Sequence, residues 1–126
     1  MVRPSVPGEK RLFWMGDSLE ALQLFPDKVK DAIGEALSVA QFGSKHPAAK
    51  PWHGEGSSVF EVVESHEGNA YRAVYTVRFA LAAYVLHVFQ KKSTRGGKTS
   101  ARDVDLIHQR LQAAKRHYEA HYGEKS

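Results

Sequence analysis

The 126-residue chain contains no cysteine. This absence excludes a disulfide scaffold, a zinc or iron–sulfur site with thiolate ligands, and a cysteine nucleophile. The short signatures of nucleotide-binding loops, serine hydrolases and zinc proteases are also missing from the sequence.

Long apolar runs are lacking too, because no stretch approaches the roughly 20 residues that cross a bilayer. The first nine residues lack the apolar segment of a signal peptide. We therefore expect a cytoplasmic protein with no membrane partner. The length and the 42% hydrophobic composition suit one globular domain. We expect a flexible N-terminus over residues 1–10 and a single domain over residues 11–122.

Positive charge is concentrated in one short segment. Residues 91–98 contain no acidic residue and four basic residues: Lys91, Lys92, Arg95 and Lys98. Their four positive charges account for the whole formal net charge of +4. Such a segment attracts phosphate groups through Coulomb attraction and counterion release. A solvated loop that only keeps the protein soluble is the alternative interpretation.

The N-terminal half predicts one strand and two helices. Residues 11–15 are typical of a short strand, and Asp17 with Glu20 predicts a capping box. The short helix that follows would turn Leu19, Leu22 and Phe25 inward. Pro26 would open the second helix, whose apolar residues recur at the helical period and predict a buried stripe: Val29, Ala32, Ile33, Ala36, Leu37 and Ala40.

The second half predicts three strands and a final helix. Residues 44–57 are rich in Pro, Gly and Ser and predict a loop. Residues 58–64, 70–80 and 82–90 are rich in Val, Tyr and Phe and predict strands, with a hairpin turn between the first two. A helix should then run from about residue 100 to 120, capped by Thr99 or Ser100. Antiparallel strands with helices grouped at the chain ends predict an α+β domain, with the two N-terminal helices and the C-terminal helix packed around an antiparallel sheet.

The middle strand alternates between two kinds of side chain. One face carries aromatic and apolar residues, whereas the other carries Arg72 and Arg78. A buried guanidinium without a partner is costly, so this second face should be wet or bind an anion. The alternative is an arginine that pairs with Glu61 or Glu64 on the neighbouring strand.

Other candidate residues have two interpretations each. Lys91 and Lys92 stand at a strand end with opposite side-chain directions, so only one should join Arg72. His87, in an apolar strand, is either a core histidine with a satisfied hydrogen bond or a general acid or base. Trp52, followed by His53, either plugs the edge of the core or stacks on a base.

His117 and His121 are four residues apart on the last predicted helix. This spacing could form a metal pair, but no third ligand is evident. We therefore expect no metal and no cofactor.

Taken together, the motifs resemble one known toxin superfamily. A Lys-Pro-Trp-x-Gly loop (50–54) follows two amphipathic helices, and then come FEVVE (60–64), YRAVYTV (71–77), YVLHVFQKKS (84–93) and a Thr-Ser helix start. Over roughly residues 11–120 this order is similar to the RelE/ParE superfamily, and most of all to its phage-derived HigB-like branch. The resemblance implies a RelE-like domain and the toxin of a type II toxin–antitoxin pair.

The resemblance also implies an activity and its residues. Many members are metal-independent endoribonucleases that cleave mRNA on the ribosome by attack of a ribose 2′-OH on the adjacent phosphate. Arg72 matches the central catalytic arginine, and Lys92 matches a basic or histidine catalytic position. Lys91 and Lys98 would support phosphate binding, as would Arg78, Lys50, Trp52 and Arg95.

The sequence also departs from the family pattern. RelE has lysines on the strand where this chain has Glu61, which would pair with Arg72 or act as a base. The tyrosine that RelE offers after its basic turn is missing, so the proton shuttle is unassigned and His87 is a candidate for it.

The resemblance implies a helix-turn-helix antitoxin, mRNA and the ribosome as partners. Two other functions stay open. One is a ParE-like inhibitor of DNA gyrase, because a fold does not fix a function. The other is a non-catalytic RNA-binding module or decayed toxin.

Overall fold

The structure is a computed structural model that describes residues 8–56, 58–91 and 99–123. The predicted site residues Lys92, Arg95 and Lys98 lie outside these described ranges. In chain order the elements are β1 (Arg11–Trp14), α1 (Ser18–Gln23), α2 (Asp27–Gln41), β2 (Ala49–Pro51), β3 (Val59–His66), β4 (Asn69–Thr76), β5 (Ala82–Lys91) and α3 (Ala101–Tyr122).

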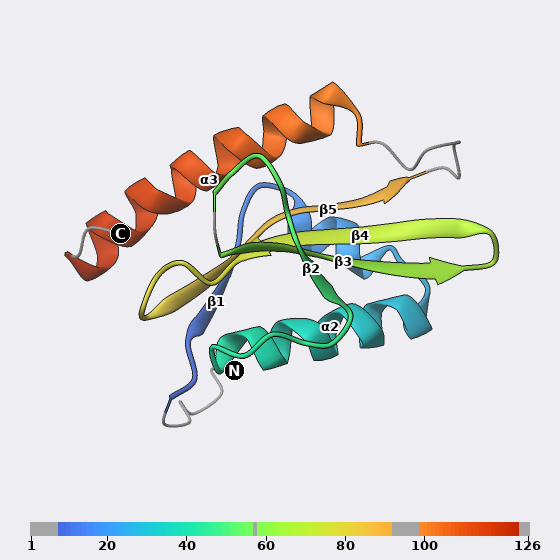
Figure 1. Ribbon diagram of the computed structural model, residues 1–126, viewed down its shortest axis with the longest axis horizontal. Coiled ribbons are helices and arrows are strands. Elements are labelled where there is room, and N and C mark those ends of the chain that lie inside the picture. The colour runs from blue at the N-terminus through green and yellow to red at the C-terminus, as the bar shows by residue number, and fades with distance from the viewer. Residues whose placement is uncertain (1–7, 57, 92–98, 124–126) are drawn as a thin grey trace.

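The strands form one five-stranded sheet in the order β1-β5-β4-β3-β2. Helices α1 and α2 pack on one face of the sheet and α3 packs on the other, which gives three layers (Figure 1). The α+β class is thus confirmed. The sheet is mixed, however, because β1 runs parallel to β5, whereas the other strand pairs are antiparallel.

Helix α2 follows the predicted apolar stripe closely. It begins after Pro26 and ends at Gln41; Phe42 caps it, and Gly43 then takes a left-handed φ of 79°. The helix buries five residues against β3 and β5, namely Val29, Ile33, Ala36, Leu37 and Ala40. The other face of the helix is exposed, as expected for a helix that covers one side of a sheet.

The predicted hairpin joins β3 to β4. Its turn lies at Glu67 and Gly68, whose φ angles of 49° and 81° are both positive. Two positive φ angles match the twist of a tight two-residue hairpin. Strand β5 lies between β1 and β4 and is buried along most of its length, so the prediction of a strand covered on both faces is confirmed.

The prediction of a wet second face on the middle strand is only partly right. Helix α3 covers part of that face and forms a second core there, in which Val74 and Leu86 meet Ile107 and Leu111. The middle strand also ends at Thr76, earlier than predicted. Arg72 therefore stands beside the helix rather than on an open sheet.

Three local predictions are wrong. Residues 49–51 form a short strand, β2, within the segment predicted as loop, because their backbone pairs with β3. The Asp17 side chain makes no capping bond; it accepts a hydrogen bond from Arg110 instead. Leu19 is 39% exposed rather than turned inward.

We also find no helix in the described ranges that has both the length and the apolarity to cross a membrane.

Candidate functional site

A cleft of about 540 Å³ opens on the α3 side of the sheet. Three parts of the chain line it: the end of β2 with its following loop, the neighbouring strands β3 and β4, and the start of α3. The lining residues are Pro51, Trp52, His53, Glu61, Arg72, Thr99 and Val104. The cleft thus joins three of the predicted site residues: Arg72, Glu61 and Trp52.

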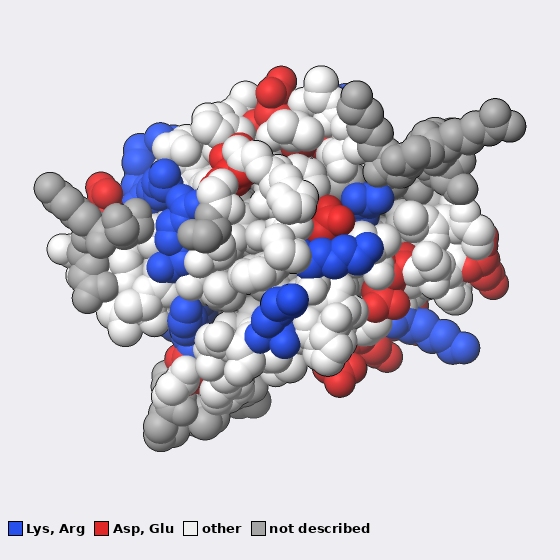
Figure 2. All heavy atoms as spheres, viewed as in Figure 1, with Lys and Arg blue, Asp and Glu red and all other residues white. Residues whose placement is uncertain are grey.

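Strand register explains why these residues meet. Glu61 lies opposite Lys50 of β2 and Val74 of β4, and Val74 lies opposite His87 of β5. Directly opposed residues point to the same face of a sheet, so this row and Arg72, two residues before Val74, all face the α3 side. Figure 2 shows basic and acidic side chains close together across the middle of the molecule, where β2 and β3 lie in Figure 1.

Arg72 and Glu61 form an ion pair on the floor of the cleft. The Nη1 atom of Arg72 lies 3.4 Å from Oε2 of Glu61, and the two side chains are only 13% and 14% exposed. The pairing with Glu61 that was one interpretation of the sequence is therefore present. A hydrogen bond of this length is at the long end of the range, so the pair does not hold the guanidinium as tightly as a short bidentate contact would.

His87 is buried and contacts protein groups through both ring nitrogens. Its Nε2 lies 2.8 Å from Oδ1 of Asp103, and its Nδ1 lies 3.2 Å from Nη1 of Arg110. Because a guanidinium only donates, Nδ1 accepts and the Nε2–H donates to Asp103. This geometry matches the core histidine with satisfied hydrogen bonds.

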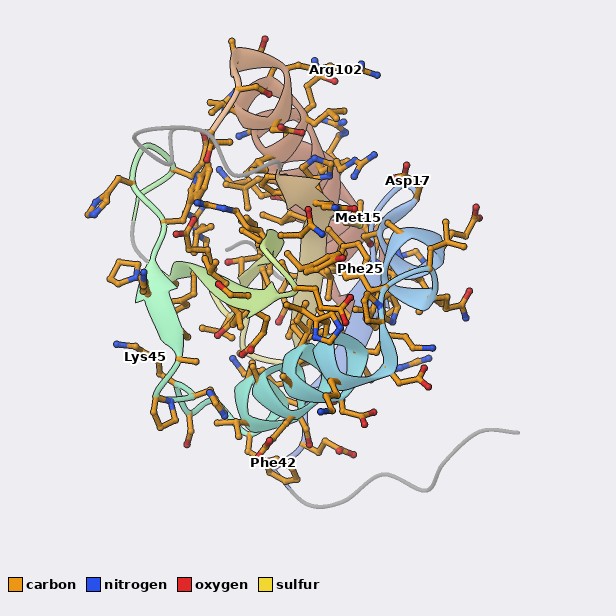
Figure 3. All side chains as sticks on the ribbon, turned by 90° about the vertical axis from the view of Figure 1, so that its right-hand side faces the viewer. Met15, Asp17, Phe25, Phe42, Lys45 and Arg102 are labelled. Atoms are coloured by element: carbon orange, nitrogen blue, oxygen red, sulfur yellow. The ribbon has the colours of Figure 1, made fainter. Side chains whose placement is uncertain are left out.

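Arg110 and Asp103 extend this network. Arg110 also donates to the Leu86 carbonyl and to Asp17, which lies at the start of α1 on the side toward α3 (Figure 3). Burial raises the pKa of Asp103, but hydrogen bonds from Ser100 and His87 outweigh it and bring the pKa below its ordinary value. The network therefore fixes the start of α3, and with it Thr99 and Val104, against β5.

The loop after β2 is held by two further contacts. Arg78 donates to the carbonyl oxygen of Glu55 at 2.7 Å, so this predicted phosphate ligand supports the loop behind the cleft. The Glu55 carboxylate accepts from Nδ1 of His108 on α3. Trp52 is 8% exposed and belongs to the core next to α3, so most of its ring serves packing and the remainder lines the cleft.

Two of the other predicted basic residues, Lys50 and Lys91, lie within the described ranges. Lys50 is exposed and lies opposite Glu61. Lys91 pairs through its backbone with Ala70 at the end of β5, while Lys92, Arg95 and Lys98 lie outside the described residues. Thr99, the next residue described, lines the cleft.

Among the described residues that line the cleft, four were not predicted as site residues from the sequence: Pro51, His53, Thr99 and Val104. The first two carried a signal, since they adjoin Lys50 and Trp52 in the Lys-Pro-Trp motif. Val104 was assigned to the buried stripe of the last helix, but it is 38% exposed because it faces the cleft.

The histidine pair near the end of α3 lies apart from this cleft. The rings of His117 and His121 stack with centroids 3.9 Å apart, and His117 contacts the Tyr84 hydroxyl. Within the part of the chain that the structure describes, no group of three or more His, Asp or Glu residues could hold a metal ion.

A family model for phage-derived Gp49-like proteins (DUF891) matches residues 20–112, close to three quarters of the chain. The chain belongs to the phage-derived Gp49-like family. The match runs from α1 into α3, so it contains every residue that lines the cleft of this Gp49-like protein. Neither the curated proteins nor the solved structures include a significant match.

Proposed function

We propose that this Gp49-like protein is the toxin of a type II toxin–antitoxin system, of the HigB-like branch, and that it cleaves mRNA on the ribosome. The observation that supports this proposal most is the cleft that holds Arg72 and Glu61 between the Trp52 loop and the start of α3. Membership of a phage-derived family is consistent with such a toxin. The proposed unit is the single domain over residues 11–122.

The proposed reaction needs no metal or cofactor. The 2′-oxygen of a ribose attacks the adjacent phosphorus and loses its proton, and the bond from phosphorus to the 5′-oxygen breaks. The leaving 5′-oxygen takes up a proton, and a 2′,3′-cyclic phosphate remains. Because negative charge builds on the phosphorane oxygens, a fixed guanidinium beside them lowers the barrier. We assign this role to Arg72.

Glu61 is our candidate for the general base. Its carboxylate lines the same cleft and lies 3.4 Å from the Arg72 guanidinium, so a phosphate held by Arg72 would bring the neighbouring 2′-OH near it. Lys92 is proposed as the second catalytic cation. Lys91, Arg95 and Lys98 are proposed to bind flanking phosphates, together with Lys50, which lies opposite Glu61 on β2.

Of the two roles that the sequence left open for His87, we propose the structural one and not that of a general acid or base. Both of its ring nitrogens face Asp103 and Arg110, which leaves neither directed at a substrate. We therefore propose that His87 positions α3 rather than transferring a proton.

A helix-turn-helix antitoxin is the expected partner besides mRNA and the ribosome. It would neutralise the toxin by covering the basic residues or by blocking its access to the ribosome. A non-catalytic RNA-binding module is the second candidate function. The ion pair between Arg72 and Glu61 favours a non-catalytic role, because the carboxylate neutralises part of the charge that would stabilise a phosphorane.

Mapping of mRNA 5′ ends after brief induction of the protein tests the proposal. We expect new ends in register with the reading frame, and their loss in Arg72→Ala and Lys92→Ala. Arg116→Ala is the matched control, because Arg116 is exposed and about 18 Å along the helix axis from Val104. Growth arrest without new ends would instead indicate gyrase inhibition, and neither effect would indicate a binding module.

A further inference from the structure

The loop of residues 52–56 forms one wall of the cleft without a helix or strand of its own. Gly54 and Gly56 have φ angles of 108° and 81°, so the backbone turns through conformations that side chains rarely adopt. The backbone N–H of Trp52 donates to the Val59 carbonyl oxygen, and the Ser58 carbonyl oxygen accepts from the Thr76 hydroxyl and the Val77 N–H, so both ends of the loop are tied to the sheet. The position of the middle of the loop has to come from other contacts.

Glu55 supplies those contacts. Its carbonyl oxygen accepts from Arg78, which ties the loop to the segment after β4. Its carboxylate oxygens lie 2.9 and 3.2 Å from Nδ1 of His108, which ties the loop to α3. The Glu55 side chain is only 10% exposed, whereas that of His108 is 59% exposed. The histidine thus covers the carboxylate from outside.

The position of His108 relates this pair to the cleft. His108 follows Val104 by four residues, which is one helical turn, so both side chains lie on the same side of α3. Val104 lines the cleft from the helix, and Trp52 and His53 line it from the loop. The pair of Glu55 and His108 therefore connects the two opposing walls just beyond the cleft.

We propose that Glu55 and His108 are positioning residues, which set the distance between the loop and α3 so that the cleft accepts a nucleotide of single-stranded RNA. This inference rests on the proposed function. In the free protein the pair holds the walls in place, so binding RNA does not have to order the loop. Losing the pair should weaken substrate binding and leave the chemical step at Arg72 unchanged.

The first test measures mRNA cleavage against the concentration of programmed ribosomes. In His108→Ala we expect KM to rise about threefold, the size expected for the loss of one hydrogen bond, with kcat unchanged. His108→Gln keeps an N–H donor and should recover most of the loss. Gln109→Ala, an exposed neighbour on α3, is the control and should behave as wild type. A fall in kcat at unchanged KM would overturn the proposal.

The second test does not depend on RNA cleavage. Amide hydrogen exchange over residues 53–56 should speed up in His108→Ala and in Glu55→Ala, while exchange in the β4–β5 core stays unchanged. Unchanged loop exchange in both variants would overturn the proposal. If wild-type protein fails to cleave mRNA yet the loop exchange responds, the proposed function fails and the role of the pair in fixing the loop stands.

Discussion

Arg72 and Glu61 lie on neighbouring strands with their charged groups 3.4 Å apart, both largely buried on the floor of one cleft. They are diagonal partners, because Glu61 is opposite Val74 and Arg72 is opposite Val63. Diagonal placement lets the two groups approach one another while both still face the cleft. The cation that would bind a phosphate and the carboxylate that would accept a hydroxyl proton thus lie side by side.

The Glu61→Gln substitution separates the two roles of this carboxylate. If Glu61 is the general base, the single-turnover cleavage rate should fall by roughly 100-fold or more, since general bases contribute on that scale. Binding of a non-cleavable oligonucleotide with a 2′-deoxy substitution should not weaken, because Glu61→Gln removes a negative charge that repels the phosphate. An unchanged or faster cleavage rate would show that Glu61 only pairs with Arg72.

Much of this architecture could be predicted from local sequence patterns. The stripe of α2, the hairpin turn at Glu67 and Gly68, and the cap of α3 at Ser100 each depend on residues within a few positions of one another. Ser100 indeed accepts a hydrogen bond from the backbone N–H of Asp103. Glu61 was one of the two residues predicted to pair with Arg72, and the structure confirms this contact. The prediction was possible because a tight hairpin limits which residues of one strand can lie near a given residue of the other.

The remaining features depend on contacts between distant parts of the chain. Asp17 has the sequence context of a helix cap, but Arg110, 93 residues later, binds it instead. Strand β2 has three residues and contains a proline, so it carries no alternation that could identify it. The shape of the cleft depends on where α3 lies over the sheet, and no local pattern encodes that position. The roles of Lys92, Arg95 and Lys98 stay predictions.

Two glycine substitutions should have opposite effects on stability. At Gly16, with φ 55°, an added Cβ would lie 2.6 Å from the Arg110 guanidinium, so Gly16→Ala should destabilise the fold by about 1–3 kcal/mol. Gly34 is exposed within α2 and has open space around it, so Gly34→Ala should stabilise by about 0.5–1 kcal/mol. Urea unfolding measures both values, and equal effects at the two positions would contradict the combined strain of the positive φ and the nearby guanidinium at Gly16.

A second matched pair tests two buried tyrosine hydroxyls. The Tyr75 hydroxyl has no hydrogen-bond partner within the described ranges, and burial raises its pKa to about 12. The Tyr118 hydroxyl accepts from the Leu81 N–H at 3.2 Å. Tyr118→Phe should therefore cost about 1 kcal/mol of unfolding free energy, whereas Tyr75→Phe should be neutral or slightly stabilising. The same urea titration distinguishes them, and a larger loss at Tyr75 would indicate a partner such as buried water.

The network around Asp103 should make stability fall in acid. Hydrogen bonds from Ser100 and His87 bring the pKa of Asp103 below its ordinary value of 3.8, despite the opposing effect of burial. A carboxyl group with a lowered folded-state pKa stabilises the fold fully above its unfolded-state pKa, and this contribution is lost as the pH falls through the folded-state pKa. Asp103→Asn should therefore be less stable than wild type at pH 7, with a difference that shrinks below about pH 4.

Urea unfolding from pH 7 to pH 3 measures this difference. Asp105→Asn is the control, because Asp105 is an exposed residue on the same helix. It should show little pH-dependent difference from wild type. A gap between wild type and Asp103→Asn that stays constant down to pH 3 would mean that the carboxylate charge is not what ties α3 to His87. In that case the start of α3, and the cleft wall that it forms, would depend on packing instead.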